Sequence, residues 1–93
     1  MLPSVWAEEA IQDVETLVAY IAQRNSVAAL RIRNLIVDAA QRLGEHPYLY
    51  REGRERGTRE VVVHPNYIIV YRVELAMIRV VNVLHASRQY PPL

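Results

Sequence analysis

Apolar residues recur at helical spacing in two consecutive segments of the N-terminal half. The first segment begins near Glu8 and ends near Arg24, so that acids lie at its start and a cation at its end, where the helix dipole favours each charge. After a break at Asn25-Ser26, a second stripe follows the same spacing. Ser26 is the expected N-cap of the second helix, and Gly44 is the expected residue just beyond its end.

The two helices are expected to pack together because the link between them is so short. Such a link produces an antiparallel hairpin, and the two apolar stripes must then face a common surface. The residues expected on that surface are Ile11, Val14, Leu17, Val18, Ile21, Ala29, Ile32, Ile36, Ala39 and Leu43.

The C-terminal half is rich in Val, Ile and Tyr and predicts strands instead of helices. Three strands are expected, at Arg59–His64, Tyr67–Val73 and Ile78–His85. Pro65-Asn66 is a turn between the first two, and another turn lies within residues 74–77.

Two shorter segments complete the order of elements. Leu2 to Trp6 is typical of a short edge strand, because proline is tolerated at a sheet edge. Arg51 to Thr58, with the sequence REGRERGT, is expected to be a charged loop whose charges are solvated. The order β-α-α-β-β-β predicts an α+β fold in which an antiparallel helix hairpin packs on an antiparallel sheet. Residues 1–93 are expected to form one domain.

The strand register brings arginines together. A two-residue turn at Pro65-Asn66 places His64 opposite Tyr67 and, counting outward, Arg59 opposite Arg72. Alternation then puts both arginines on one face. The side chains expected to share that face are Val61, Val63, Ile68 and Val70.

The second turn leaves two registers open. If Leu75-Ala76 is a two-residue turn, Arg79 lies opposite Arg72, and Val81, Val83 and His85 share their face. A three-residue turn moves Arg79 and His85 to the other face. Like charges directly opposite each other are unfavourable, so these arginines need acidic partners. The partners are either glutamates of this chain or groups of another molecule, such as a phosphate or an acidic peptide.

Composition narrows the classes of function. The chain has 93 residues, a hydrophobic fraction of 52% and a net charge of +1, and all of its basic residues are Arg. The high apolar content suggests that a partner covers part of the surface. The small net charge argues against a protein that grips nucleic acid mainly by charge.

No cofactor, metal site or membrane segment is expected. The chain contains no cysteine, and its histidines, His46, His64 and His85, lack the spacing of metal ligands. No stretch is apolar for long enough to span a membrane. A cysteine-free chain fits the reducing cytoplasm.

The end of the last strand carries candidate chemistry. His85, Arg88 and Tyr90 supply the residue types that metal-independent RNA cleavage needs, namely a base, a cation and an acid. Their spacing alone is not specific, and a histidine at a strand end is more often structural.

Several segments together resemble a known superfamily. Gly57-Thr58-Arg59-Glu60, the strand Tyr67 to Val73 and the ending His85-x-x-Arg88-Gln89-Tyr90-Pro91 resemble the RelE/ParE superfamily of bacterial type II toxins, and most closely its ParE branch. The resemblance implies a toxin that is encoded beside a small antitoxin and is neutralised in a hetero-oligomer with it. It also implies one of two activities. ParE-like members are described as inhibitors of DNA gyrase without chemistry of their own, and RelE-like members cut mRNA on the ribosome without a metal.

The sequence favours the gyrase inhibitor, because the chain lacks the strongly basic character of a ribosome-dependent nuclease. Arg59, Arg72 and Arg79 are the first candidates for contact with the target or partner, followed by His85, Arg88 and Tyr90. In the alternative, an mRNA endonuclease, the resemblance makes Arg59, Arg72, His85 and Tyr90 the catalytic candidates. A third hypothesis is a structural partner of an antitoxin that has lost its toxicity.

Overall fold

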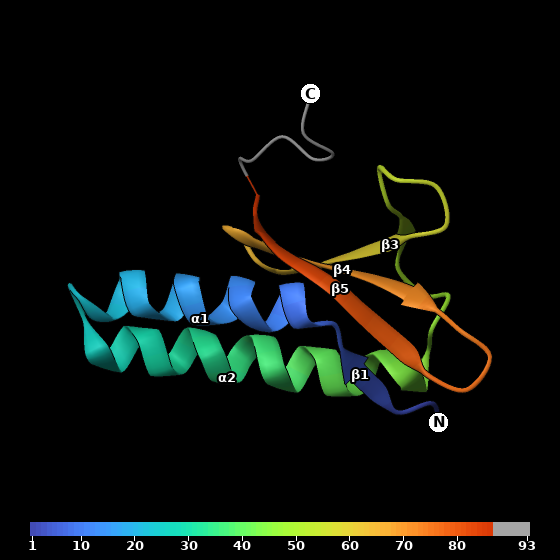
Figure 1. Ribbon diagram of the computed structural model, residues 1–93, viewed down its shortest axis with the longest axis horizontal. Coiled ribbons are helices and arrows are strands. Elements are labelled where there is room, and N and C mark those ends of the chain that lie inside the picture. Colours follow the sequence, from blue (N-terminus) through green and yellow to red (C-terminus); the bar gives the residue numbers. More distant parts are fainter. Residues whose placement is uncertain (87–93) are drawn as a thin grey trace.

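Two helices form a hairpin that covers one face of a five-stranded sheet (Figure 1). The computed structural model describes residues 1–86. The elements are β1 (Ser4–Trp6), α1 (Glu8–Ala22), α2 (Ser26–Arg42), the 3-10 helix η1 (Leu43–Glu45), β2 (Arg51–Glu52), β3 (Arg59–His64), β4 (Tyr67–Val73) and β5 (Ile78–His85). The α+β fold is therefore confirmed. Within residues 1–86, no helix is both long enough and apolar enough to cross a membrane.

The helix ends differ in detail from the prediction. Asn25, and not Ser26, is the N-cap of α2, and its Oδ1 accepts a hydrogen bond of 3.0 Å from the backbone N–H of Ala28. Gly44 does not end the helix in a left-handed conformation, because the chain continues into η1. Gly44 is needed for a different reason. A Cβ at this position would collide with the backbone carbonyl of Leu2.

The hairpin buries its apolar stripes against the sheet. Ile36 and Ala40 of α2 and Ala10 of α1 are fully buried, and they pack with Ile69 and Tyr71 of β4. Most of the expected core positions are confirmed. The exceptions on α1 are Ile11, which is 44% exposed, and Ile21, which is half-buried and lies outside the core cluster.

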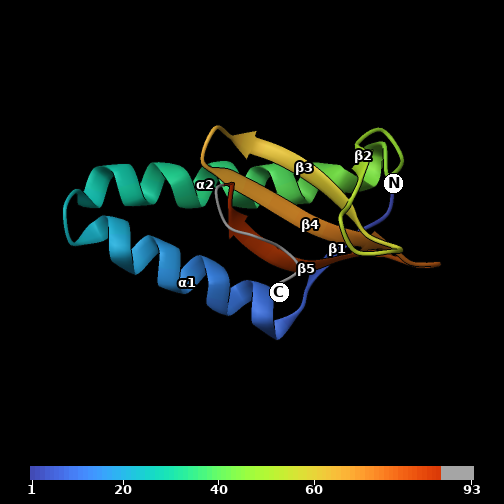
Figure 2. The ribbon, with the colours of Figure 1, turned by 90° about the horizontal axis from the view of Figure 1, so that it is seen from above.

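The sheet is mixed, with strand order β1-β5-β4-β3-β2. The three long strands are antiparallel, as predicted, but the edge strand β1 runs parallel to β5, with Ser4 opposite Ile78. Figure 2, seen from above, shows β5, β4 and β3 crossing over the helices. Period-2 alternation alone does not report strand direction, so the sequence did not reveal the parallel pair.

Two irregularities change the predicted register. His64 lies opposite Tyr67, as expected, but the register shifts between Val62 and His64, so Arg59 lies opposite Tyr71 and not opposite Arg72. One inserted residue moves every later side chain to the other face. Arg59 therefore shares the helix-facing side with Val61.

The turn between β4 and β5 has the two-residue register, since Arg72 lies opposite Arg79. A second register shift, between Val70 and Tyr71, then separates these arginines from the end of β5. Val83 packs in the helix-facing core instead of sharing the face of Arg79. By alternation, His85 follows Val83 to the helix-facing side.

Candidate functional site

The face of the sheet that points away from the helices carries a row of three paired residues. Val5 of β1 lies opposite Arg79 of β5, which in turn lies opposite Arg72 of β4. Their neighbours along the strands, such as Trp6 and Val80, pack in the helix-facing core, so alternation points the row outward. We call Val5, Arg79 and Arg72 the arginine row.

Arg79 is compensated within the chain. Its Nε donates a hydrogen bond of 2.7 Å to Oε2 of Glu74, at the start of the β4–β5 turn. This hydrogen bond and the charge of the Glu74 carboxylate raise the pKa of Arg79 above its ordinary value. The guanidinium thus remains a permanent cation whose position is set by a neighbour.

Arg72 has a different environment. Its Nη1 donates to the backbone carbonyl of Arg56 at 3.3 Å, and among residues 1–86 no carboxylate lies within 4.0 Å of its guanidinium. Gly57 makes this contact possible. It adopts a φ of +82°, and a Cβ there would lie 2.8 Å from Nη1 of Arg72. Arg72 is therefore held in place by a carbonyl, with donors left for an external anion.

Glu60 of β3 is a buried acid near the row. Its side chain is 3% exposed, and its two oxygens lie 3.1 Å from Nη2 of Arg51 and 3.7 Å from Nε of Arg54. The backbone N–H of Arg54 donates to the same carboxylate at 3.1 Å. The prediction of a purely solvated loop at 51–58 was therefore wrong. β2 and Arg54 fold back on Glu60 because a buried carboxylate needs partners.

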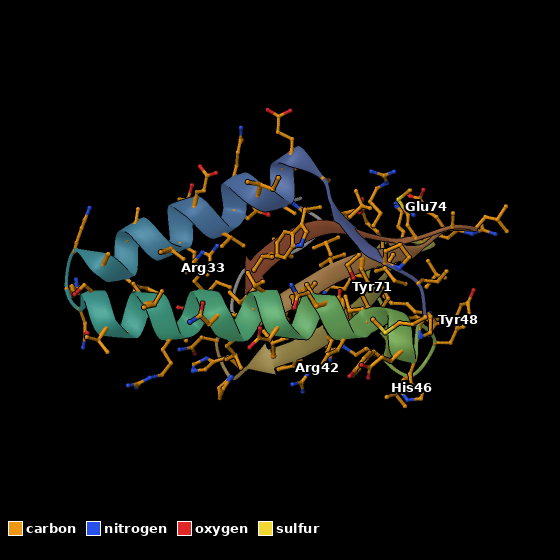
Figure 3. All side chains as sticks on the ribbon, turned by 90° about the horizontal axis from the view of Figure 1, so that it is seen from below. Arg33, Arg42, His46, Tyr48, Tyr71 and Glu74 are labelled. Atoms are coloured by element: carbon orange, nitrogen blue, oxygen red, sulfur yellow. The ribbon has the colours of Figure 1, made fainter. Side chains whose placement is uncertain are left out.

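Arg59 fixes the connector, the segment 46–50 between η1 and β2. Its Nη1 donates to the carbonyl of Tyr50 at 2.7 Å, and its guanidinium lies over the ring of Tyr48, 5.0 Å from the centroid. Figure 3 shows Tyr48 at the end of the molecule where α2 stops. Arg59 also lines a hollow of about 420 Å³ together with Gly57 and Val73. This arginine does not join the arginine row.

His85 lies at the other end of β4 from the arginine row. It is opposite Tyr67, with the two rings edge to face at 5.6 Å between centroids, and it borders a groove lined by Leu17 and Tyr20 of α1. Arg72 is five residues along the strand from Tyr67, which corresponds to roughly 17 Å. Arg88 and Tyr90 lie outside the described residues.

The sequence-predicted residues therefore occupy three separate places. Arg72 and Arg79 lie together on the outer face, Arg59 lies beside the connector, and His85 lies at the far end of the sheet. The sequence did not reveal the place of Val5 or the pairing of the buried Glu60 with Arg51 and Arg54. The alternation of β1, in which Trp6 faces the core, would have placed Val5 outward once the strand pairing was known. In the described part of the chain, no group of three His, Asp or Glu side chains could hold a metal ion.

Comparison with known proteins identifies the class. A family model described as the ParE toxin of the type II toxin–antitoxin system parDE matches residues 5–90. The chain is thus a toxin of the RelE/ParE superfamily, which confirms the resemblance seen in its strands. Within that superfamily it belongs to the ParE toxin family of type II toxin–antitoxin systems.

Two relatives cover nearly the whole chain. Toxin RelE2 of Caulobacter vibrioides is 34% identical over 94 residues, which is 95% of this chain and 99% of that protein. The protein Y4kP of Sinorhizobium fredii is 34% identical over 87 residues, which is 92% of this chain and 90% of that protein.

Solved structures share the fold. The chromosomal ParDE toxin–antitoxin system from P. aeruginosa contains a chain with a TM-score of 0.81 and 16% identity, over 91% of this chain and 96% of that one. The E. coli DinJ-YafQ toxin–antitoxin complex contains a chain with a TM-score of 0.55 and 16% identity, over 96% and 97%. At these identities the likeness concerns the fold alone.

Proposed function

We propose that the protein is a ParE-type toxin that inhibits DNA gyrase by binding to it, without chemistry of its own. The observation that carries this proposal is the separation of Arg59, Arg72 and His85. Metal-independent RNA cleavage needs a base, a cation and an acid within hydrogen-bond reach of one phosphate. Arg72 points to the outer face and His85 to the helix-facing side, and their positions lie roughly 17 Å apart along β4, so the two side chains do not meet at one phosphate.

The electrostatics support the same proposal. The net charge of +1 gives a weak electrostatic footprint for a protein that must hold ribosomal RNA and mRNA. Glu60, the buried acid of the outer face, is paired with Arg51 and Arg54, so it is poorly suited to act as a general base. A protein that acts by binding another protein requires neither a strongly basic surface nor a general base.

A cognate antitoxin is the proposed neutralising partner. The helices carry large apolar side chains that are more than half exposed, which marks surface for a partner to cover. These residues are Tyr20, Val27 and Leu30. The relatives in the P. aeruginosa ParDE system and the E. coli DinJ-YafQ complex are described as parts of toxin–antitoxin systems, which supports a hetero-oligomer here. A segment that folds on binding can cover a surface of this kind.

A supercoiling assay tests the proposed activity. Purified toxin at micromolar concentration is added to purified bacterial gyrase and relaxed plasmid, and the loss of supercoiled product is measured. We expect inhibition that disappears when the antitoxin is added in equal amount. Gyrase that is unaffected by micromolar toxin would contradict the proposal.

The second candidate is a ribosome-dependent mRNA endonuclease. It is favoured by the 34% identity to a protein named Toxin RelE2 and by the guanidinium of Arg72, which has no carboxylate partner among residues 1–86. Primer extension on ribosome-bound mRNA tests it, and absence of cuts with wild-type toxin excludes it. Growth that continues after induction without antitoxin would support the third candidate, a partner without toxicity.

A further inference from the structure

Exposed apolar residues accompany the arginine row. Val5, at the β1 end, is 39% exposed, and Leu75, at the tip of the β4–β5 turn, is fully exposed. The turn projects beyond the rest of the sheet (Figure 1). Arginine beside exposed aliphatic side chains is the composition of a protein interface, where arginine is enriched and lysine depleted.

The two arginines together create a site for an anion. Residues directly opposite each other on antiparallel strands have their Cα atoms about 4.5–5.5 Å apart, and like charges in such a pair repel. Glu74 compensates Arg79, but within the described residues no carboxylate pairs with Arg72. A carboxylate from another molecule would relieve this repulsion and accept hydrogen bonds from the remaining N–H groups of Arg72.

The exposed aliphatic residues beside the arginines select the kind of partner. The acids of this face do not, because Glu74 is paired with Arg79, and the buried Glu60 is paired with Arg51 and Arg54. A continuous polyphosphate backbone has no apolar group to place on Leu75 or Val5. A peptide segment can place one or two carboxylates on the arginines and aliphatic side chains beside them.

We propose that the arginine row, with Leu75 at the hairpin tip, docks an acidic segment of the toxin's protein target. This inference deepens the proposed function, because it names the surface of the toxin that meets the target and the chemistry of the target segment. The helix hairpin, with its exposed Tyr20, Val27 and Leu30, is then left to the antitoxin.

The test compares acidic substitutions at Arg72 and Leu75 with an acidic substitution elsewhere on the surface. Arg72→Glu and Leu75→Asp are made alongside Arg42→Glu, which alters an exposed arginine at the end of α2. The measurement is the toxin concentration that halves supercoiling by purified gyrase. We expect this concentration to increase about tenfold or more for Arg72→Glu and for Leu75→Asp, as for interface hot spots. For Arg42→Glu it should change by no more than about twofold, as for ordinary surface sites. Equal inhibition by all three variants overturns the docking surface.

Folding and target identity are controlled separately. Far-UV circular dichroism and the melting temperature show whether each variant is folded, and Arg72→Gln and Leu75→Ala replace a variant that is not. If wild-type toxin leaves gyrase unaffected, the proposed function fails. The docking surface is then tested by the growth arrest that follows induction of each toxin variant in bacteria. Loss of arrest with folded Arg72→Glu and Leu75→Asp then supports the surface, and retained arrest overturns it.

Nucleic acid is the competing partner for these arginines. Fluorescence anisotropy with a labelled DNA duplex, at physiological salt, measures binding by wild-type toxin and by Arg72→Glu. We expect no difference between the two proteins. Tight binding by wild-type toxin that Arg72→Glu abolishes would overturn an acidic protein segment as the occupant.

Discussion

The carboxylate of Asp13 on α1 is bound to the open edge of β5. Its Oδ2 accepts a hydrogen bond of 2.9 Å from the backbone N–H of Val83 and another of 3.0 Å from Nδ2 of Asn82. β1 pairs with β5 only as far as Val80, so the following stretch of that edge has no strand beside it among residues 1–86. An acceptor from the helix satisfies one of the edge donors and ties α1 to the sheet.

Asp13→Ala should therefore destabilise the fold. The substitution leaves the partly buried N–H of Val83 without its acceptor, at a cost of about 1–3 kcal/mol. Asp13→Asn, which keeps one acceptor oxygen, should cost less. Urea unfolding measures both, with Asp38→Ala at an exposed position of α2 as the control. The same unfolding free energy for Asp13→Ala and Asp38→Ala would contradict this function of Asp13.

Tyr71 links the sheet to the connector after α2. It is fully buried, and its hydroxyl donates to the carbonyl of Pro47 at 2.8 Å. Burial raises the pKa of this hydroxyl, an effect that the nearby Arg59 opposes and Tyr50 reinforces. A phenol whose pKa is raised by folding stabilises the protein fully below the unfolded pKa of about 10 and loses that contribution as pH rises further.

Tyr71→Phe should thus reduce stability at neutral pH by about 1 kcal/mol, the net value of one hydrogen bond. It should also weaken the loss of stability that wild-type protein shows above about pH 10. Unfolding free energies between neutral and strongly alkaline pH check both effects. If the unfolding free energies of the two proteins fall equally as pH rises above about 10, Tyr71 is not the group whose ionisation destabilises the fold.

Gly57 is expected to position Arg72. Its φ of +82° is strained for side chains with a Cβ, and a Cβ there would crowd Nη1 of Arg72. Gly57→Val should cost about 1–3 kcal/mol, whereas Gly57→Asn should cost less because asparagine tolerates positive φ. Thermal melting measures the difference. A valine variant as stable as the asparagine variant would show that the loop adjusts freely.

Arg59 should be important for stability and not for target contact. Arg59→Ala removes the hydrogen bond to the Tyr50 carbonyl and the contact with the Tyr48 ring, which together are worth about 1–2 kcal/mol. The inhibitory strength per folded molecule should stay within about twofold of wild type. A folded Arg59→Ala protein that no longer inhibits gyrase would show instead that Arg59 contacts the target.

The fold was largely predictable because the helix stripes and the Val-rich strands carry strong periodic signals. The two register shifts were not. Residues 61–63 are all valine, and so are residues 80 and 81, so alternation leaves no mark where an extra residue is inserted. Each shift reverses the faces beyond it, which is why Arg59 was placed wrongly while the Arg72–Arg79 pair, close to its turn, was placed correctly.

The environment of Glu60 was equally hidden from the sequence. In REGRERGTRE, charged residues alternate so densely that any carboxylate could pair with any arginine. Only the pairing of β2 with β3, which places Arg51 opposite Glu60, selects the partners. Long-range pairing of this kind depends on the folded backbone and not on local composition.

The most direct test of the central claim is the inhibition of gyrase supercoiling by purified wild-type toxin, with ribosome-bound mRNA treated in parallel. We expect supercoiling to fall with rising toxin concentration while the mRNA remains intact. Cleaved mRNA together with unimpaired gyrase would contradict it.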